Sequence, residues 1–197
     1  MAARGAYAKG VAKRDEILTT ALDVIARHGY RNASIRELAA AVGLSQTGLL
    51  HYFDTKEQLF VEVLRKRDEV DAATFGAPID QGSATPDIVE GMIRVVRHNA
   101  DVPGLVQLYA QFSTEAAEPG HPARDFFLQR YAAFREMVSS AIREKQAASE
   151  LSPTLDPDRI ANLLLAASDG LQTQWMLDDS IDMADHIAYL WERLTGE

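Results

Sequence analysis

Residues 35–54 read IRELAAAVGLSQTGLLHYFD, and the fold of the chain follows from this stretch. Two amphipathic runs meet at Gly43, a residue type that commonly ends helices in a left-handed conformation. Ser34 and Glu37 are spaced as a capping box, which predicts that the first helix begins at residue 35. Ser45 stands at the N-cap position of the second helix. Two short helices joined by so tight a turn predict a helix-turn-helix.

One side of this motif is apolar and the other is polar. Ala39 is small enough to let the two helices approach each other closely. The apolar seam that the helices share consists of Leu38, Val42, Leu44, Leu49 and Phe53. The polar side of the second helix carries Gln46, Thr47, His51 and Tyr52. Side chains of this kind form hydrogen bonds with base edges and phosphates in a major groove, so the motif predicts DNA binding.

Helical periodicity continues on both sides of the motif, and no stretch alternates apolar and polar residues as a strand does. Before the motif, apolar spacing predicts a helix over about residues 11–28 that ends at Gly29. Glycines and prolines between residues 76 and 86 predict a loop. The later helices are expected to open at Thr55 and then to cover about residues 86–101, 103–117, 122–148, 157–178 and 182–195. The expected fold is all-α, with about nine helices.

The charge of the chain is unevenly distributed along the sequence. The formal net charge is −9, but residues 1–56 carry +3 and residues 57–197 carry −12. Phosphate contacts need local positive potential, so only the N-terminal segment suits a DNA-binding surface.

Other classes of chemistry are not indicated by the sequence. The chain has no cysteine, which excludes disulfides, thiolate metal sites and a cysteine nucleophile. The five histidines are far apart, and the acidic cluster at residues 178–185 fits a helix boundary, so we expect no metal site and no cofactor. No catalytic motif stands out, so we do not expect an enzyme. No apolar run approaches the roughly 18 residues that cross a bilayer, and we expect a cytoplasmic protein.

The wider stretch 17–60, ILTTALDVIARHGYRNASIRELAAAVGLSQTGLLHYFDTKEQLF, resembles the N-terminal domain of the TetR family of transcriptional regulators. The resemblance rests on features in register: a preceding helix, the Gly29-Tyr30 step, the turn glycine, the Tyr52-Phe53 pair and Lys56-Glu57. It implies a homodimer that places two recognition helices in successive major grooves of a pseudo-palindromic operator. It also implies a DNA-binding domain over residues 1–56 and an effector-binding and dimerisation domain over residues 57–197.

The resemblance implies particular DNA contacts. The matching positions are Ser34, Ser45, Gln46, Thr47, Gly48, His51, Tyr52 and Lys56. Lys9, Lys13 and Arg14 are expected to contact phosphates or the minor groove from an N-terminal arm that is mobile without DNA. Leu50 departs from the family, which usually has tyrosine at that position. This departure favours one alternative, a helical ligand-binding or adaptor protein that has lost operator recognition; a small helical enzyme is a second.

The last two predicted helices carry wide apolar stripes. By resemblance they pair with their copies in a second subunit as a four-helix bundle. The interface residues expected from these stripes are Leu164, Leu171, Trp175, Ile187, Leu190, Trp191 and Leu194. The alternative is that both helices only cover the core of their own chain.

The middle helices are rich in aromatic residues and methionine, as the wall of an apolar cavity would be. The residues expected to bind an effector are Met92, His98, Tyr109, Phe112, Phe127, Tyr131, Phe134, Gln172, Trp175 and Met176. Apolar walls with a few polar groups suit a small, mostly apolar effector, which would act by favouring a dimer shape that no longer fits the operator.

Overall fold

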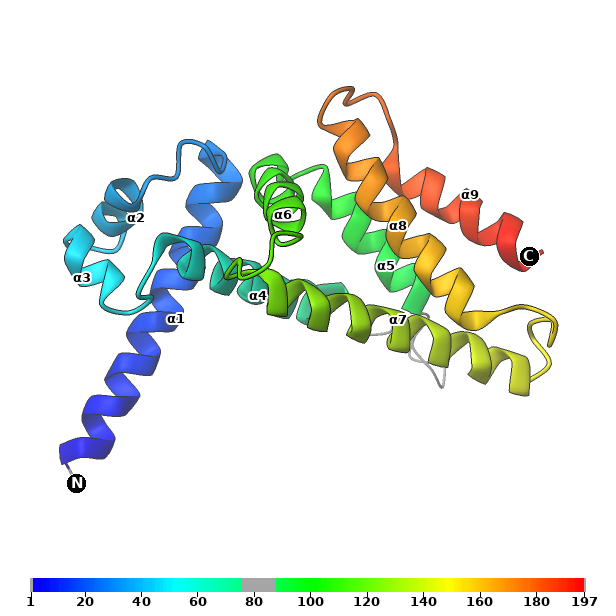
Figure 1. Cartoon of the computed structure of the whole chain (residues 1–197), viewed down its shortest axis with the longest axis horizontal. Helices are drawn as coiled ribbons and strands as arrows, with labels where there is room; N and C mark the ends of the chain where they lie inside the picture. Colours follow the sequence, from blue (N-terminus) through cyan, green and yellow to red (C-terminus); the bar gives the residue numbers. More distant parts are fainter. Residues whose placement is uncertain (1, 76–87, 197) are drawn as a thin grey trace. The chain divides into compact units, whose positions relative to one another are not determined.

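The computed structural model describes residues 2–75 and 88–196, and of residues 2–8 it describes the backbone alone. These ranges contain helices and no strand, and Figure 1 labels the helices in chain order. The helices are α1 (Ala2–His28), α2 (Ile35–Ala41), α3 (Gln46–Leu50), α4 (Lys56–Phe75), α5 (Ile88–Asn99), α6 (Pro103–Glu115), α7 (Arg124–Ala147), α8 (Pro157–Trp175) and α9 (Met183–Thr195). The prediction of an all-α fold with about nine helices is confirmed. The loop predicted at 76–86 lies outside the described residues.

Most of the predicted helix boundaries agree with the structure, but the first helix begins much earlier than predicted. The structure has α1 from Ala2, whereas the apolar spacing predicted a start near residue 11. Lys9, Lys13 and Arg14 therefore lie within α1, and no separate N-terminal arm precedes them among the described residues. The physical reason is that alanines dominate residues 2–8, and alanine has the highest helix propensity even where no apolar stripe is present.

Two compact units make up the chain. Unit 1 comprises residues 1–70 and 102–123, so it contains α1 to α3, most of α4, and α6. Tyr30 packs edge-on against Phe60 of α4 at 5.2 Å between ring centroids and against Phe112 of α6 at 6.0 Å. These rings place α6 in the core that supports the helix-turn-helix. The predicted division at residue 56 therefore differs from the division by packing, because helices distant in sequence share this core.

Gly104 lies where α6 meets the end of α1 within unit 1. A Cβ atom at this position would overlap the carbonyl oxygen of Ile25 and come within 2.8 Å of the Gly29 Cα atom. The two helix backbones approach so closely that no side chain fits between them. This contact fixes α6 against α1.

Unit 2 comprises residues 71–101 and 124–197, which include α5, α7, α8 and α9. Its core is formed by apolar residues from all four helices, including Val96, Val138, Leu164 and Ile187. The start of α8 follows the predicted signal, since Asp156 caps the helix ahead of a proline at the first helical position. Within the ranges that the structure describes, no helix combines the length and the apolar character needed to cross a membrane.

Candidate nucleic-acid interface

The start of α2 is fixed by the predicted capping box. The Ser34 hydroxyl oxygen accepts a hydrogen bond from the Glu37 backbone N–H at 3.2 Å, and the Ser34 backbone N–H donates to the Glu37 carboxylate at 2.9 Å. The Ser34 hydroxyl also donates to that carboxylate at 2.8 Å. The backbone and side-chain hydrogen bonds from Ser34 hold the pKa of Glu37 below its ordinary value. The charged carboxylate therefore closes the first turn of the helix.

This capping box makes stability depend on pH in a defined direction. The pKa of Glu37 is lowered in the folded state, so its charged carboxylate stabilises the folded protein. This contribution to stability is fully present above the ordinary glutamate pKa of about 4.3 and is lost as the pH falls through the lowered pKa. We expect Glu37→Gln to melt at a lower temperature than the wild type at neutral pH. The difference between the two melting temperatures should shrink as the pH falls below the ordinary glutamate pKa. Thermal melts of both proteins across this range measure it. A difference that stays constant down to strongly acidic pH would contradict the role of the carboxylate.

The turn between α2 and α3 has the predicted conformation. Gly43 adopts a φ of 67°, in the left-handed region that favours glycine. The backbone N–H of Leu44 donates to the Ala39 carbonyl at 2.8 Å, which brings the chain back across the end of α2. Ser45 then caps α3, because its hydroxyl oxygen accepts a hydrogen bond from the Gly48 backbone N–H at 3.0 Å. The sequence-based prediction of this turn is confirmed.

The apolar seam of the motif is buried as predicted. Leu49 is 0% exposed and Phe53 is 3% exposed, so α3 is held by its inner face. Leu38, Ala39 and Val42 are buried as well, and Leu44 is half-buried. A helix of only a few residues needs such an anchor, because isolated short helices are unstable in water.

The opposite face of α3 is open to solvent. Gln46, Thr47 and His51 are exposed, and Tyr52 is half-buried. The ring of Tyr52 lies 6.1 Å from that of His51 and 6.5 Å from that of Phe53, so it joins the polar face to the core. Of the other predicted DNA contacts, Ser45 and Lys56 are exposed, whereas Ser34 and Gly48 are half-buried. The motif thus brings these residues together in one short segment, and their contacts with DNA stay a prediction.

Lys13 and Arg14 are engaged within unit 1. The Lys13 ammonium donates to the Val42 carbonyl at 3.1 Å and to the Glu16 carboxylate at 2.8 Å. The Arg14 guanidinium donates to the Glu62 carboxylate at 3.1 Å, and its central carbon lies 4.8 Å from the centroid of the Phe53 ring. Both cations therefore brace the motif in this structure. Sequence reasoning missed Glu62, because it is 48 positions from Arg14 and only the tertiary fold pairs them.

The ten predicted effector residues are divided between the two units. Tyr109 and Phe112 are core residues of unit 1. The other eight belong to unit 2, where Met92, Phe127 and Gln172 are buried. Tyr131 is half-buried and its hydroxyl donates to the Asp169 carboxylate at 2.8 Å, which links α7 to α8. The periodicity of the sequence predicted that these residues are buried, but it does not specify in which of the two cores each residue packs.

The predicted dimer residues mostly face the core of their own chain. Leu164 and Ile187 are 0% exposed, and Trp191 is buried beside them. Leu171, Trp175, Leu190 and Leu194 are partly buried against the same core. The large apolar side chains left exposed on α8 and α9 are Leu163, 49% exposed, and Tyr189, 58% exposed. Leu163 and Tyr189 were not among the predicted interface residues. Leu163 is adjacent to the buried Leu164, so the apolar stripe of α8 is wider than the core of this chain covers.

Among the described residues, no group of three or more His, Asp or Glu side chains is arranged to hold a metal ion.

Two family models match the chain in separate regions. Residues 17–63 match the model of bacterial regulatory proteins of the tetR family, and residues 103–194 match the C-terminal model of BetI-type transcriptional repressors. RutR, an HTH-type transcriptional regulator of Escherichia coli K12, is 40% identical over 55 residues, which are 28% of this chain and 26% of RutR. The match therefore spans about a quarter of that relative.

Solved structures of similar proteins cover nearly the whole chain. A TetR-family transcriptional regulator from Rhodococcus sp. superposes with a TM-score of 0.71 at 22% identity, covering 93% of this chain and 98% of that one. A transcriptional regulator from Saccharomonospora viridis, solved in complex with choline, has a TM-score of 0.65 at 26% identity and covers 92% and 94% of the two chains. The first of these likenesses bears on the fold alone.

Proposed function

Because the chain belongs to the TetR family of bacterial regulatory proteins, we propose that it is a sequence-specific DNA-binding repressor that a small molecule releases from a pseudo-palindromic operator. The observation that supports this most is the exposed polar face of α3, anchored from behind by Leu49 and Phe53. A rigidly held helix with short polar side chains is what readout of base edges requires. The charge of +3 over residues 1–56, in a chain of net charge −9, supports the same surface.

The proposed repressor acts as a homodimer, because a two-fold symmetric operator requires two recognition helices related by the same symmetry. Residues 1–56 supply the DNA contacts, and residues 57–197 supply the effector site and the dimer contacts. The exposed Leu163 and Tyr189 are the residues of α8 and α9 that we assign to the outer part of this interface.

A small organic cation with apolar groups is the effector class that we propose. The S. viridis relative, at 26% identity, was solved with choline. In unit 2, the rings of Phe127 and Tyr131 lie 5.8 Å apart, and the Tyr131 hydroxyl bonds to Asp169. Aromatic faces beside a carboxylate attract quaternary ammonium groups, whose methyl groups also suit apolar walls.

Binding measurements on DNA test the proposed function. The protein is first used to select duplexes from a random pool. Fluorescence anisotropy should then show that it binds a selected duplex more tightly than unselected ones, and that its affinity falls steeply as the salt concentration rises. An adaptor protein without operator recognition, the alternative suggested by Leu50, would enrich no sequence in such a selection. Failure to enrich any duplex would overturn the proposal.

Effector release is a separate prediction. We expect millimolar choline to dissociate the operator complex, and its uncharged isostere 3,3-dimethylbutanol to have a much weaker effect, since only the cation interacts with aromatic faces and a carboxylate. Asp169→Asn should abolish the response to choline while operator affinity without ligand is retained. Equal responses to choline and the isostere, or an unchanged response in Asp169→Asn, would contradict the proposed cation site.

A further inference from the structure

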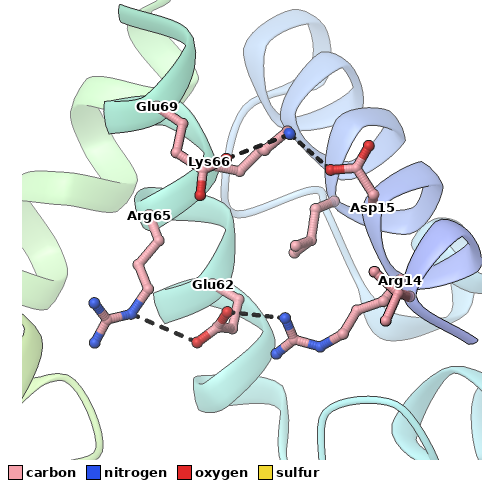
Figure 2. Close-up of a pocket in the computed structure, with 8 residues that line it drawn as sticks. Arg14, Asp15, Glu62, Arg65, Lys66 and Glu69 are labelled. Carbon is pink, nitrogen blue, oxygen red and sulfur yellow. Dashed lines mark hydrogen bonds and ion pairs between the residues drawn. The ribbon is translucent and has the colours of Figure 1, made fainter. Parts of the chain in front are cut away.

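A charged cleft of about 380 Å³ lies between α1 and α4 in unit 1. Figure 2 shows Lys66 and Glu62 of α4 pointing toward Asp15 and Arg14 of α1. Three acidic and three basic residues line it: Asp15, Glu62, Glu69, Arg14, Arg65 and Lys66. The opposite charges balance, so the cleft offers no net positive charge to a phosphate.

The charges of the cleft form four ion pairs, two between the helices and two within α4. The Lys66 ammonium lies 2.6 Å from the Asp15 carboxylate and 3.4 Å from that of Glu69. One oxygen of Glu62 lies 3.1 Å from the Arg14 guanidinium of α1, and the other lies 3.5 Å from that of Arg65. Glu62 thus forms an ion pair with one basic side chain of each helix.

Arg14 links three separate segments of unit 1. It belongs to α1, it pairs with Glu62 of α4, and its guanidinium covers the ring of Phe53 just beyond α3. Phe53 is 3% exposed and is one of the anchors of the recognition helix. A planar guanidinium can pair with a carboxylate along its edge and cover an aromatic ring with its face at the same time.

We propose that the Arg14–Glu62 pair is a positioning clamp that fixes the recognition helix relative to α1 and α4, and that Arg14 does not serve as a phosphate contact. This inference rests on the proposed DNA-binding function. A phosphate that bound the guanidinium would compete with the Glu62 carboxylate, 3.1 Å away, and with the Phe53 ring. Readout of base edges needs α3 in a defined orientation, so a small loss of positioning weakens operator binding more than random binding.

The direction in which one substitution changes operator affinity distinguishes this clamp from simple electrostatics. Glu62→Ala removes a negative charge from the DNA-binding unit, so electrostatics alone predicts tighter binding to all DNA. The clamp predicts the opposite for the operator, with affinity lowered roughly three- to tenfold and affinity for random duplexes unchanged or slightly raised. Glu69→Ala is the matched control, because it removes the same charge from the same helix and leaves Arg14 and Phe53 untouched. It should not lower operator affinity.

Arg14→Met tests the same clamp from the other side. If Arg14 is a positioning residue, Arg14→Met should lower the ratio of the affinity for the operator to the affinity for random duplexes. In the Glu62→Ala background the same substitution should lower operator affinity little further. A phosphate contact would instead weaken operator and random binding alike, lower the salt slope by about one per subunit, and keep its full effect in that background. Either the second pattern or tighter operator binding by Glu62→Ala would overturn the clamp.

Amide hydrogen exchange provides a readout that needs no DNA. The amides of Leu49 and Phe53 donate to the Ser45 and Leu50 carbonyls and report the order of α3 and the segment after it. Exchange should quicken in Glu62→Ala and stay unchanged in Glu69→Ala. If the wild type selects no duplex, the proposed function fails while this comparison still tests the clamp. If operator binding is found but neither exchange nor the affinity ratio responds to Glu62→Ala, the clamp alone fails.

Discussion

Gly104→Ala is expected to destabilise the protein by about 3 kcal/mol, because the added methyl group has no space between α6 and α1. The Cβ atom would overlap the Ile25 carbonyl oxygen and lie 2.8 Å from the Gly29 Cα atom. These neighbours are backbone atoms of a helix end, so they cannot rotate away as a side chain would. The helices must separate, which also loosens the packing of Tyr30 on Phe112. For a chain of this size the melting temperature should fall by roughly 6–12 °C.

Gly10→Ala is the matched control for this substitution. Gly10 lies within α1 in the same unit, and a Cβ atom there would meet no other atom within 4 Å. We expect it to raise stability by about 0.5–1 kcal/mol, because alanine loses less backbone entropy in a helix than glycine. Thermal melts of both variants make the comparison. If Gly104→Ala melted at or above the temperature of the wild type, the close approach of α6 and α1 would be disproved.

Replacing both Gln46 and His51 with alanine is expected to lower operator affinity at least 100-fold, on the estimate of about 1–3 kcal/mol for each lost contact to a base edge. Both side chains are exposed on the outer face of α3. The effect is large because a homodimer loses each contact twice. The fall should be much smaller for random duplexes, since contacts with bases carry the sequence preference. Fluorescence anisotropy with operator and random duplexes measures both affinities.

Two controls accompany the double variant. Its melting temperature should match that of the wild type, because neither side chain contributes to the core. Gln129→Ala removes an exposed glutamine from α7 and should leave operator affinity unchanged. A decrease of less than threefold in the double variant would show that the face of α3 is not the reading surface.

The sequence predicted the local elements well because their causes are local. The capping box at Ser34, the glycine at Gly43 and the cap at Ser45 each act through hydrogen bonds or backbone angles within a few residues. The start of α1 was missed because only apolar periodicity was used, and residues 2–8 form a helix through alanine propensity instead.

The predicted site residues show the same difference between local and long-range causes. Gln46, Thr47 and His51 could be placed on the outer face of α3 because helix geometry alone separates them from Leu49. Arg14 could not be distinguished from a free cation, since its partners Glu62 and Phe53 are 48 and 39 positions away. Leu164 and Ile187 were assigned to a dimer surface, but they are 0% exposed in their own chain. An apolar stripe predicts that a face is buried and does not specify by what.

The sequence by itself determined the all-α character, the helix-turn-helix with its turn and caps, and the polar face that makes DNA binding the proposed function. Each of these depends on interactions between residues close in the chain. Only the tertiary structure decided that α6 shares the core of the helix-turn-helix, that Gly104 must remain free of a side chain, and that Arg14 pairs with Glu62. These features depend on helices that are remote in sequence, and their contacts are set by packing of whole surfaces, which no local pattern encodes.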